Sequence, residues 1–165
     1  MGRHVAVALL IVAALAGCGD DEDSTLPVAI DDIRPAIDAV EAELGAGQQF
    51  FEVNATPQLV NLFVAVDDAT SAVPYIFFDG ELQPPAPALP VESGFTFGAD
   101  AVDFDVDTVL DSVADELPDS TIEGFAIEGG DGGVVRYLVS ISSSQGGVLA
   151  VTVASDGDIL EVDPL

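Results

Sequence analysis

The side chains that could do chemistry in this chain are almost all carboxylates. Its 165 residues include 30 aspartates and glutamates, three arginines, no lysine, one histidine and one cysteine. His4 is lost if an N-terminal signal is removed, as argued below. The remaining chain then lacks the imidazole of catalytic triads, the lysine of Schiff bases and nitrogen ligands for zinc, copper or haem. We therefore predict no catalytic residues, no metal site, no cofactor and no enzymatic activity.

The same charge imbalance excludes nucleic acid as a partner. Proteins bind nucleic acid by neutralising phosphates with lysine and arginine, and Walker-type phosphate loops also need a lysine. A formal charge of −27 would repel a polyphosphate. Adaptation to salty surroundings is the simplest explanation of the acidity, because salt screens self-repulsion. A basic protein partner or bound divalent cations are the alternatives.

One group of aspartates is similar to the start of a calcium loop. Asp103, Asp105 and Asp107 alternate along the chain, as the first ligands of an EF-hand do. The sixth position is Thr108 instead of glycine and the twelfth is Ala114 instead of glutamate, which excludes an EF-hand. We expect these acids to lie at a helix start, where the helix dipole favours them. Asp107, Asp111 and Asp115 would then stack on one helix face, as either a solvated stripe or a weak cation site.

The one cysteine, Cys18, lies directly after a hydrophobic N-terminal run. Residues 1–4 are a short positively charged start, and Val5 to Leu15 is an unbroken apolar run of 11 residues. That run is about half the length of a membrane-spanning helix. The stretch Leu15-Ala16-Gly17-Cys18 resembles the lipobox of bacterial lipoprotein signal peptides. The resemblance implies cleavage between Gly17 and Cys18 and a lipid thioether on the sulfur of Cys18.

This resemblance implies a location as well as a modification. Residues 1–17 would be the signal peptide, and lipidated Cys18 would hold the protein in the cell membrane at its extracytoplasmic face. Residues 18–28 would follow as an acidic, solvated tether. An ordinary signal peptide with a chance cysteine at its cleavage site is the alternative.

Hydrophobic periodicity predicts a helix and three strands over residues 29–82. A helical stripe is formed by Ile33, Ile37, Val40 and Leu44. Strands are expected at residues 50–53, 59–66 and 72–78, which are rich in valine and aromatic residues. Because both faces of 59–66 are apolar, we expect that strand to be central and covered on both sides.

The same order recurs over residues 102–165, after a proline-rich connector at 83–101. Its helical stripe ends at Pro118 and consists of Val106, Val109, Leu110, Val113 and Leu117. Strands are expected at residues 121–128, 134–142 and 148–155.

A constant offset of 77 residues aligns the two halves. It pairs Leu62 with Val139, Ile76 with Val153, and the turn Asp79-Gly80 with Asp156-Gly157. We therefore predict an α+β fold of two tandem α-β-β-β units that share or pack antiparallel sheets, with the helices on one face. Chance agreement between common apolar residues is the alternative.

The end of the second half resembles a known family. Residues 151–162, a strand and turn closing the unit at 102–162, look like the end of a PepSY-type domain. These small extracytoplasmic modules are suspected of binding or restraining peptidases. The tandem arrangement over 29–162 is similar to that of bacterial beta-lactamase inhibitor proteins, although their disulfides are missing here. No functional residue is transferred by either resemblance.

These observations predict a lipid-anchored, non-enzymatic interaction module of the cell envelope that recognises or restrains an envelope protein. The alternatives are a carrier or sensor of a small apolar ligand, or a cation-stabilised envelope protein. A pocket lined by Phe63, Tyr75 and Phe77 would favour the carrier. A filled core with an exposed apolar patch would favour a protein partner.

Overall fold

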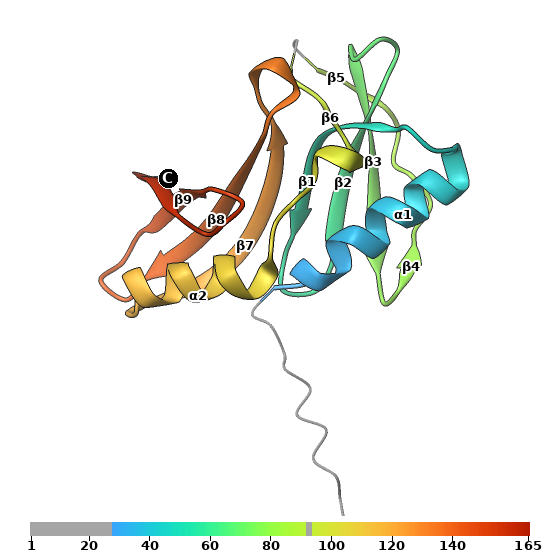
Figure 1. Cartoon of the computed structure of the whole chain (residues 1–165). Coiled ribbons are helices and arrows are strands. Elements are labelled where there is room, and N and C mark those ends of the chain that lie inside the picture. The colour runs from blue at the N-terminus through green and yellow to red at the C-terminus, as the bar shows by residue number, and fades with distance from the viewer. Residues whose placement is uncertain (1–27, 92–93) are drawn as a thin grey trace, which may run out of the picture.

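The computed structural model describes residues 28–91 and 94–165, so Gly17, Cys18 and nearly all of the predicted tether lie outside the described residues. Within these ranges, two helices lie on one ten-stranded antiparallel sheet, which is the predicted α+β class (Figure 1). The helices are α1 (Ile33–Leu44) and α2 (Val106–Glu116), and short 3-10 turns are η1 (Ile30–Asp32), η2 (Ala99–Ala101) and η3 (Asp131–Gly133). The strands are β1 (Gln49–Ala55), β2 (Val60–Val66), β3 (Ser71–Phe78), β4 (Glu81–Leu82), β5 (Leu89–Pro90), β6 (Phe97–Gly98), β7 (Ser120–Gly129), β8 (Val135–Ser143), β9 (Val148–Val153) and β10 (Ile159–Pro164).

The two halves of the chain share the sheet. Its strand order is β10-β9-β8-β7-β1-β2-β3-β4, and the halves join where β1 pairs with β7. The predicted connector over 83–101 is not a free linker, because β5 pairs with β3 and β6 pairs with β1. The two edges of this strand order are β10, which is the last strand, and β4, which has two residues.

Both helices cover the same face of the sheet, and one continuous core lies beneath them (Figure 1). α1 contributes Ile33, Ala36, Ile37 and Val40 to this core, and α2 contributes Val109, Leu110 and Val113. The core contains no buried polar or charged residue among the described residues. Burial of the apolar stripe predicted for each helix is the main force that fixes it on the sheet.

On the opposite face of the sheet, residues 28–91 and 94–165 place no helix. In β2 the side chains of Val60, Leu62 and Val64 are buried, whereas those of Asn61 and Phe63 are only partly buried. The expectation that β2 is covered on both sides was therefore wrong, although β2 does lie between β1 and β3. Apolar residues on both faces of a strand do not create a second covering layer when both helices lie on one side.

Local signals set the helix ends. α1 ends at Gly45, whose φ of 99° suits a glycine. Leu44, predicted to belong to the buried stripe, is 43% exposed because it lies in the last turn beyond the sheet contact. The N-cap of α2 is Asp105, whose carboxylate accepts a hydrogen bond from the Thr108 N–H at 2.8 Å. That bond holds the pKa of Asp105 below its ordinary value and confirms that the acid caps a helix.

The offset of 77 residues applies to only part of the two halves. Leu62 and Val139 are both buried, but their partners in the next strand, Tyr75 and Val151, are 76 residues apart. The predicted match of Ile76 with Val153 is wrong, since Ile76 is 41% exposed and Val153 is buried. A single constant spacing therefore does not describe how the two halves correspond.

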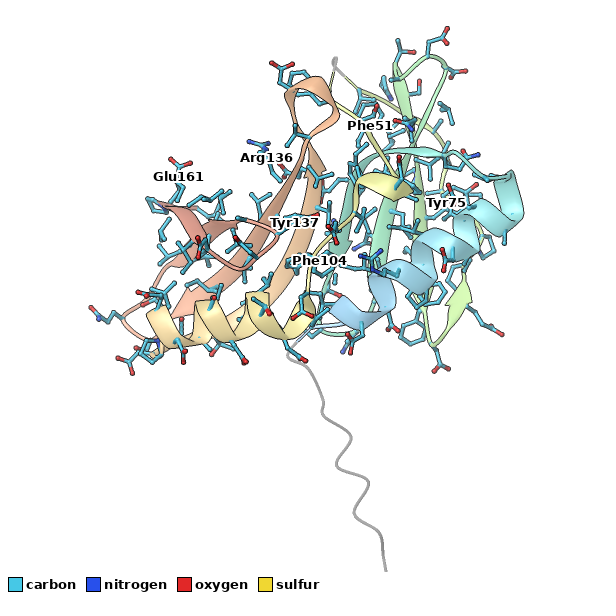
Figure 2. All side chains as sticks on the ribbon, in the orientation of Figure 1. Phe51, Tyr75, Phe104, Arg136, Tyr137 and Glu161 are labelled. Carbon is cyan, nitrogen blue, oxygen red and sulfur yellow. The ribbon has the colours of Figure 1, made fainter. Side chains whose placement is uncertain are left out.

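A cluster of rings within the second half surrounds the start of α2. Figure 2 labels Tyr137, which comes from β8, and Phe104, which precedes α2. The Tyr137 hydroxyl accepts a hydrogen bond from the Asp103 N–H and donates one to the Asp103 carbonyl, both at 2.9 Å. The Phe104 ring lies 5.4 Å from the Tyr137 ring and 4.9 Å from the Phe125 ring, centroid to centroid. These contacts attach the segment before α2 to the sheet.

Candidate functional site

A concave surface lies between α2 and β10. Among the described strands, β10 pairs with β9 alone, so it is an edge of the sheet. The register shifts between Ile159 and Glu161, which leaves Leu160 as a bulge residue. Leu160 is 66% exposed and Val162 is 44% exposed. An edge strand with exposed apolar side chains is a typical feature of an interaction surface.

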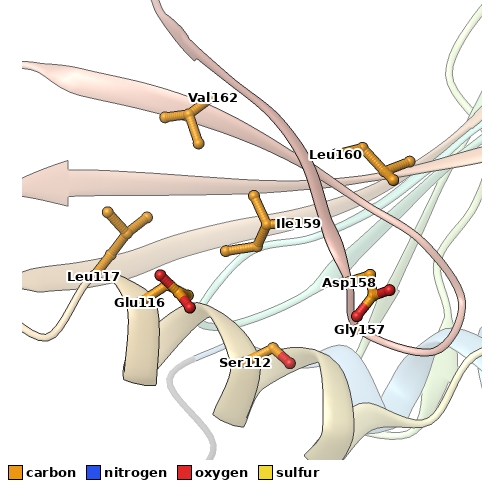
Figure 3. Close-up of a pocket in the computed structure, with 8 residues that line it drawn as sticks. All are labelled: Ser112, Glu116, Leu117, Gly157, Asp158, Ile159, Leu160 and Val162. Carbon is orange, nitrogen blue, oxygen red and sulfur yellow. The ribbon is translucent and has the colours of Figure 1, made fainter.

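A groove of about 530 Å³ separates α2 from β10 (Figure 3). One wall is α2 with the residue after it, and the other is the turn before β10 with β10 itself. The lining residues are Ser112, Glu116 and Leu117 on the first wall and Gly157, Asp158, Ile159, Leu160 and Val162 on the second. Leu117 also lines two smaller hollows beside the end of α2. We call this site the α2–β10 groove.

The groove lies outside the buried core. Val151 and Val153 of β9 pair with Val139 and Tyr137 of β8, and all four are buried. None of these four residues lines the groove. Its walls are formed instead by residues of α2 and β10 at the rim of the core, where Leu160 and Val162 stay exposed.

Gly157 fixes the turn that closes one end of the groove. Its φ is 88°, and a Cβ placed there would lie 2.8 Å from the carbonyl oxygen of Thr108 and 3.0 Å from Ser112 Oγ. Only glycine lets the chain turn this close to the helix backbone. The predicted turn at Asp156-Gly157 is therefore present and also sets the spacing between α2 and β10.

The groove carries negative charge with no basic residue among those that line it. Its ionisable side chains are those of Glu116 and Asp158. The two arginines of the described ranges are engaged elsewhere: Arg34 Nη2 donates to the Val102 carbonyl at 3.0 Å, and Arg136 Nη2 donates to Glu128 at 2.8 Å. Neither arginine therefore neutralises the groove.

Phe63, Tyr75 and Phe77 do not line a common pocket of the kind that would favour a ligand carrier. Phe63 pairs with Pro74 on the open face of the sheet, whereas Tyr75 pairs with Leu62 on the buried face. Phe63 and Tyr75 thus point to opposite sides, because neighbouring residues of a strand alternate. Tyr75 and Phe77 pack in the core beneath α1.

The other acidic and hydroxyl side chains of the second half lie on α2 and on the strands. In the described ranges no three histidine, cysteine, aspartate or glutamate side chains lie close enough together to hold a metal ion. Asp107, Asp111 and Asp115 lie exposed along α2. Ser142 Oγ donates a hydrogen bond to Glu123 at 2.7 Å, an exposed contact between two strands. None of the described helices is long and apolar enough to cross a membrane.

Sequence reasoning missed the residues of β10. The stretch at 159–162 was included in the family resemblance but was not expected to form a separate strand or a binding surface. Its apolar residues alternate imperfectly after the Asp156-Gly157 turn, and this pattern is too short to indicate an edge strand. The comparisons with known proteins add nothing to this picture, since no family model, curated protein or solved structure matches the chain.

Proposed function

We propose that the protein is a lipid-anchored interaction module on the extracytoplasmic face of the bacterial cell membrane, without enzymatic activity, and that it docks a protein partner in the α2–β10 groove. One observation carries the docking proposal: a groove with exposed apolar residues of an edge strand lies at the rim of the buried core. Exposed apolar surface of this kind persists in soluble proteins mainly where a partner covers it. Its volume also lies within the roughly 300–1,000 Å³ typical of binding sites.

The membrane location is supported by the Leu15-Ala16-Gly17-Cys18 stretch and the acidic residues after it. A diacylglyceryl group on Cys18 gives the two acyl chains needed for stable anchoring. The acidic tether would hold the domain away from an anionic lipid surface while leaving its grooves open to other envelope proteins.

We also infer that the two halves are copies of one α-β-β-β unit. The inference is supported by buried residues at matching register positions: Val53 pairs with Leu62 as Phe125 pairs with Val139. The spacing between matching residues is 72 in the first strand and 77 in the second. The spacing therefore increases by five residues between these two strands. The loop around η3 joins them, so an insertion of five residues in that loop accounts for the increase.

Substitution of Cys18 tests the anchor. Cys18→Ser removes the thiol that accepts the lipid, so nearly all of the protein is expected to move from the membrane fraction to the soluble extracytoplasmic fraction. Fractionation of cells, with mass spectrometry of the N-terminal peptide, measures both location and modification. An unmodified Cys18 in the unsubstituted protein would contradict the anchor without bearing on the groove.

Cross-linking in intact cells tests the docking site. A photoreactive residue at Leu160 is expected to capture one specific protein, whereas the same residue at Phe78, near the opposite edge of the sheet, is not. Val162→Asp should reduce that capture at least about tenfold, because it places a charge against an apolar contact. Leu44→Asp is the matched control, since Leu44 is 43% exposed and Val162 is 44% exposed. Capture from Phe78 alone, or equal loss in both aspartate variants, would assign docking to another surface.

A further inference from the structure

We propose that the segment docked in the α2–β10 groove is an extended, cationic stretch of the partner, which lies along β10 and presents lysine or arginine side chains to the groove. This inference rests on the proposed function, because it specifies the partner chemistry for the same site.

The lining of the groove matches a lysine or arginine side chain in two respects. Leu117, Ile159 and Val162 give an apolar surface for an aliphatic stem. Glu116 and Asp158 give carboxylates for the charged head, Glu116 beside Leu117 and Asp158 beside Gly157 (Figure 3). Long basic side chains bury their stems along apolar surface while their charge stays near solvent or an acid. An apolar or acidic segment would leave one of these two surfaces unmatched.

The C-terminal turn of α2 adds a second attraction for a cation. A helix ends in unpaired carbonyl groups that carry partial negative charge, which a nearby lysine, arginine or histidine normally offsets. The last turn of α2 has no basic residue and carries Asp115 and Glu116 instead. A cation from a partner would therefore complete an end that this chain leaves uncompensated.

The free edge of β10 favours an extended partner. The Leu165 N–H donates to the Val148 carbonyl, so the hydrogen-bonded positions facing β9 are residues 161, 163 and 165. The N–H and carbonyl of Val162 then point to the free edge, where a partner strand can pair with them. A residue opposite Val162 would have its side chain on the same face as Val162, which is the groove side.

A second copy of this chain is a poorer occupant. Antiparallel pairing of β10 with itself would bring Glu161 and Asp163 close to the same residues of the copy, and like charges across strands are destabilising. Pro164, which has no N–H to offer at the free edge, also shortens the stretch that can pair. Each copy carries a formal charge of −27, which opposes association further.

Peptide titration of the full chain in detergent micelles tests the inference. The probe is an acetylated and amidated peptide of alternating valine and lysine, and its control has glutamine in place of every lysine. The lysine peptide is expected to bind about tenfold more tightly, with less difference at high salt. The pair Glu116→Gln and Asp158→Asn should remove the difference. The pair Asp38→Asn and Glu81→Gln removes the same charge from exposed sites elsewhere and should preserve it.

The outcomes separate this inference from the proposed function. Equal binding of both peptides would overturn the cationic partner and leave docking at the groove intact, because Val162→Asp tests docking independently. The cationic partner would also be overturned if neither peptide bound while the photoreactive residue at Leu160 still captured a partner in cells. A dimer in sedimentation that Val162→Asp abolishes would assign the groove to a second copy and overturn it as well.

Discussion

Replacing Gly157 with alanine is expected to lower the free energy of unfolding by about 2–4 kcal/mol. Two costs add at this position. The φ of 88° is unfavourable for any residue with a Cβ. The new methyl group would also lie 2.8 Å from the carbonyl oxygen of Thr108, which belongs to the backbone of α2 and cannot rotate away.

Gly146→Ala separates the two costs. Gly146 has a φ of 91°, but a Cβ placed there meets nothing within 4 Å. Urea unfolding of both variants therefore measures the backbone cost in Gly146→Ala and the backbone cost plus the helix contact in Gly157→Ala. Equal losses of unfolding free energy would mean that the turn at Gly157 is not held against α2 and does not set the spacing between α2 and β10.

The buried face of the fold could be predicted from sequence because it depends on local periodicity. Helical spacing marked the stripe from Ile33 to Val40, and each of the six predicted strands overlaps a strand of the structure. Alternation fixes which residues of a strand share a face. It does not fix what covers that face. The partly exposed Phe63 shows this limit, since its environment depends on where the two helices lie.

The groove could not be predicted because its two walls come from distant parts of the chain. Ser112 and Leu117 lie in and directly after α2, whereas Leu160 and Val162 lie in β10, with three strands between the two elements. Hydrophobic periodicity describes each of these segments separately. The walls meet because the turn at Gly157 lies against the Thr108 carbonyl of α2, and no local pattern encodes that contact.

Removal of the Tyr137 hydroxyl is expected to lower the free energy of unfolding by about 1–3 kcal/mol at pH 7. Tyr137→Phe keeps the ring in its cluster but leaves the N–H and carbonyl of Asp103 without the partner that both now have. The segment that leads into α2 would then be held by fewer bonds. Urea unfolding followed by circular dichroism measures the loss.

The same residue is expected to make the protein sensitive to alkali. Burial raises the pKa of Tyr137 above its ordinary value, and the Asp103 carboxylate adds to the rise, whereas its backbone hydrogen bond and Arg34 oppose it. A pKa that is higher in the folded state means that the folded protein binds the proton more tightly than the unfolded chain does. The stabilisation is therefore complete below about pH 10 and is lost as the pH rises through the folded-state pKa. Tyr137→Phe should flatten this alkaline fall in unfolding free energy.

Tyr75→Phe is the control that separates the hydrogen bonds from the titration. The pKa of Tyr75 is also raised, by burial and by the nearby charge of Glu43, but its hydroxyl forms no hydrogen bond with the described residues. Tyr75→Phe should therefore cost little at pH 7 and still reduce the alkaline fall. If both variants lost the same stability at pH 7, the two bonds to Asp103 would not be what holds the start of α2 to the sheet. The start of that helix, and with it one wall of the groove, would then depend on the rings of Phe104 and Phe125 together with the buried stripe of the helix.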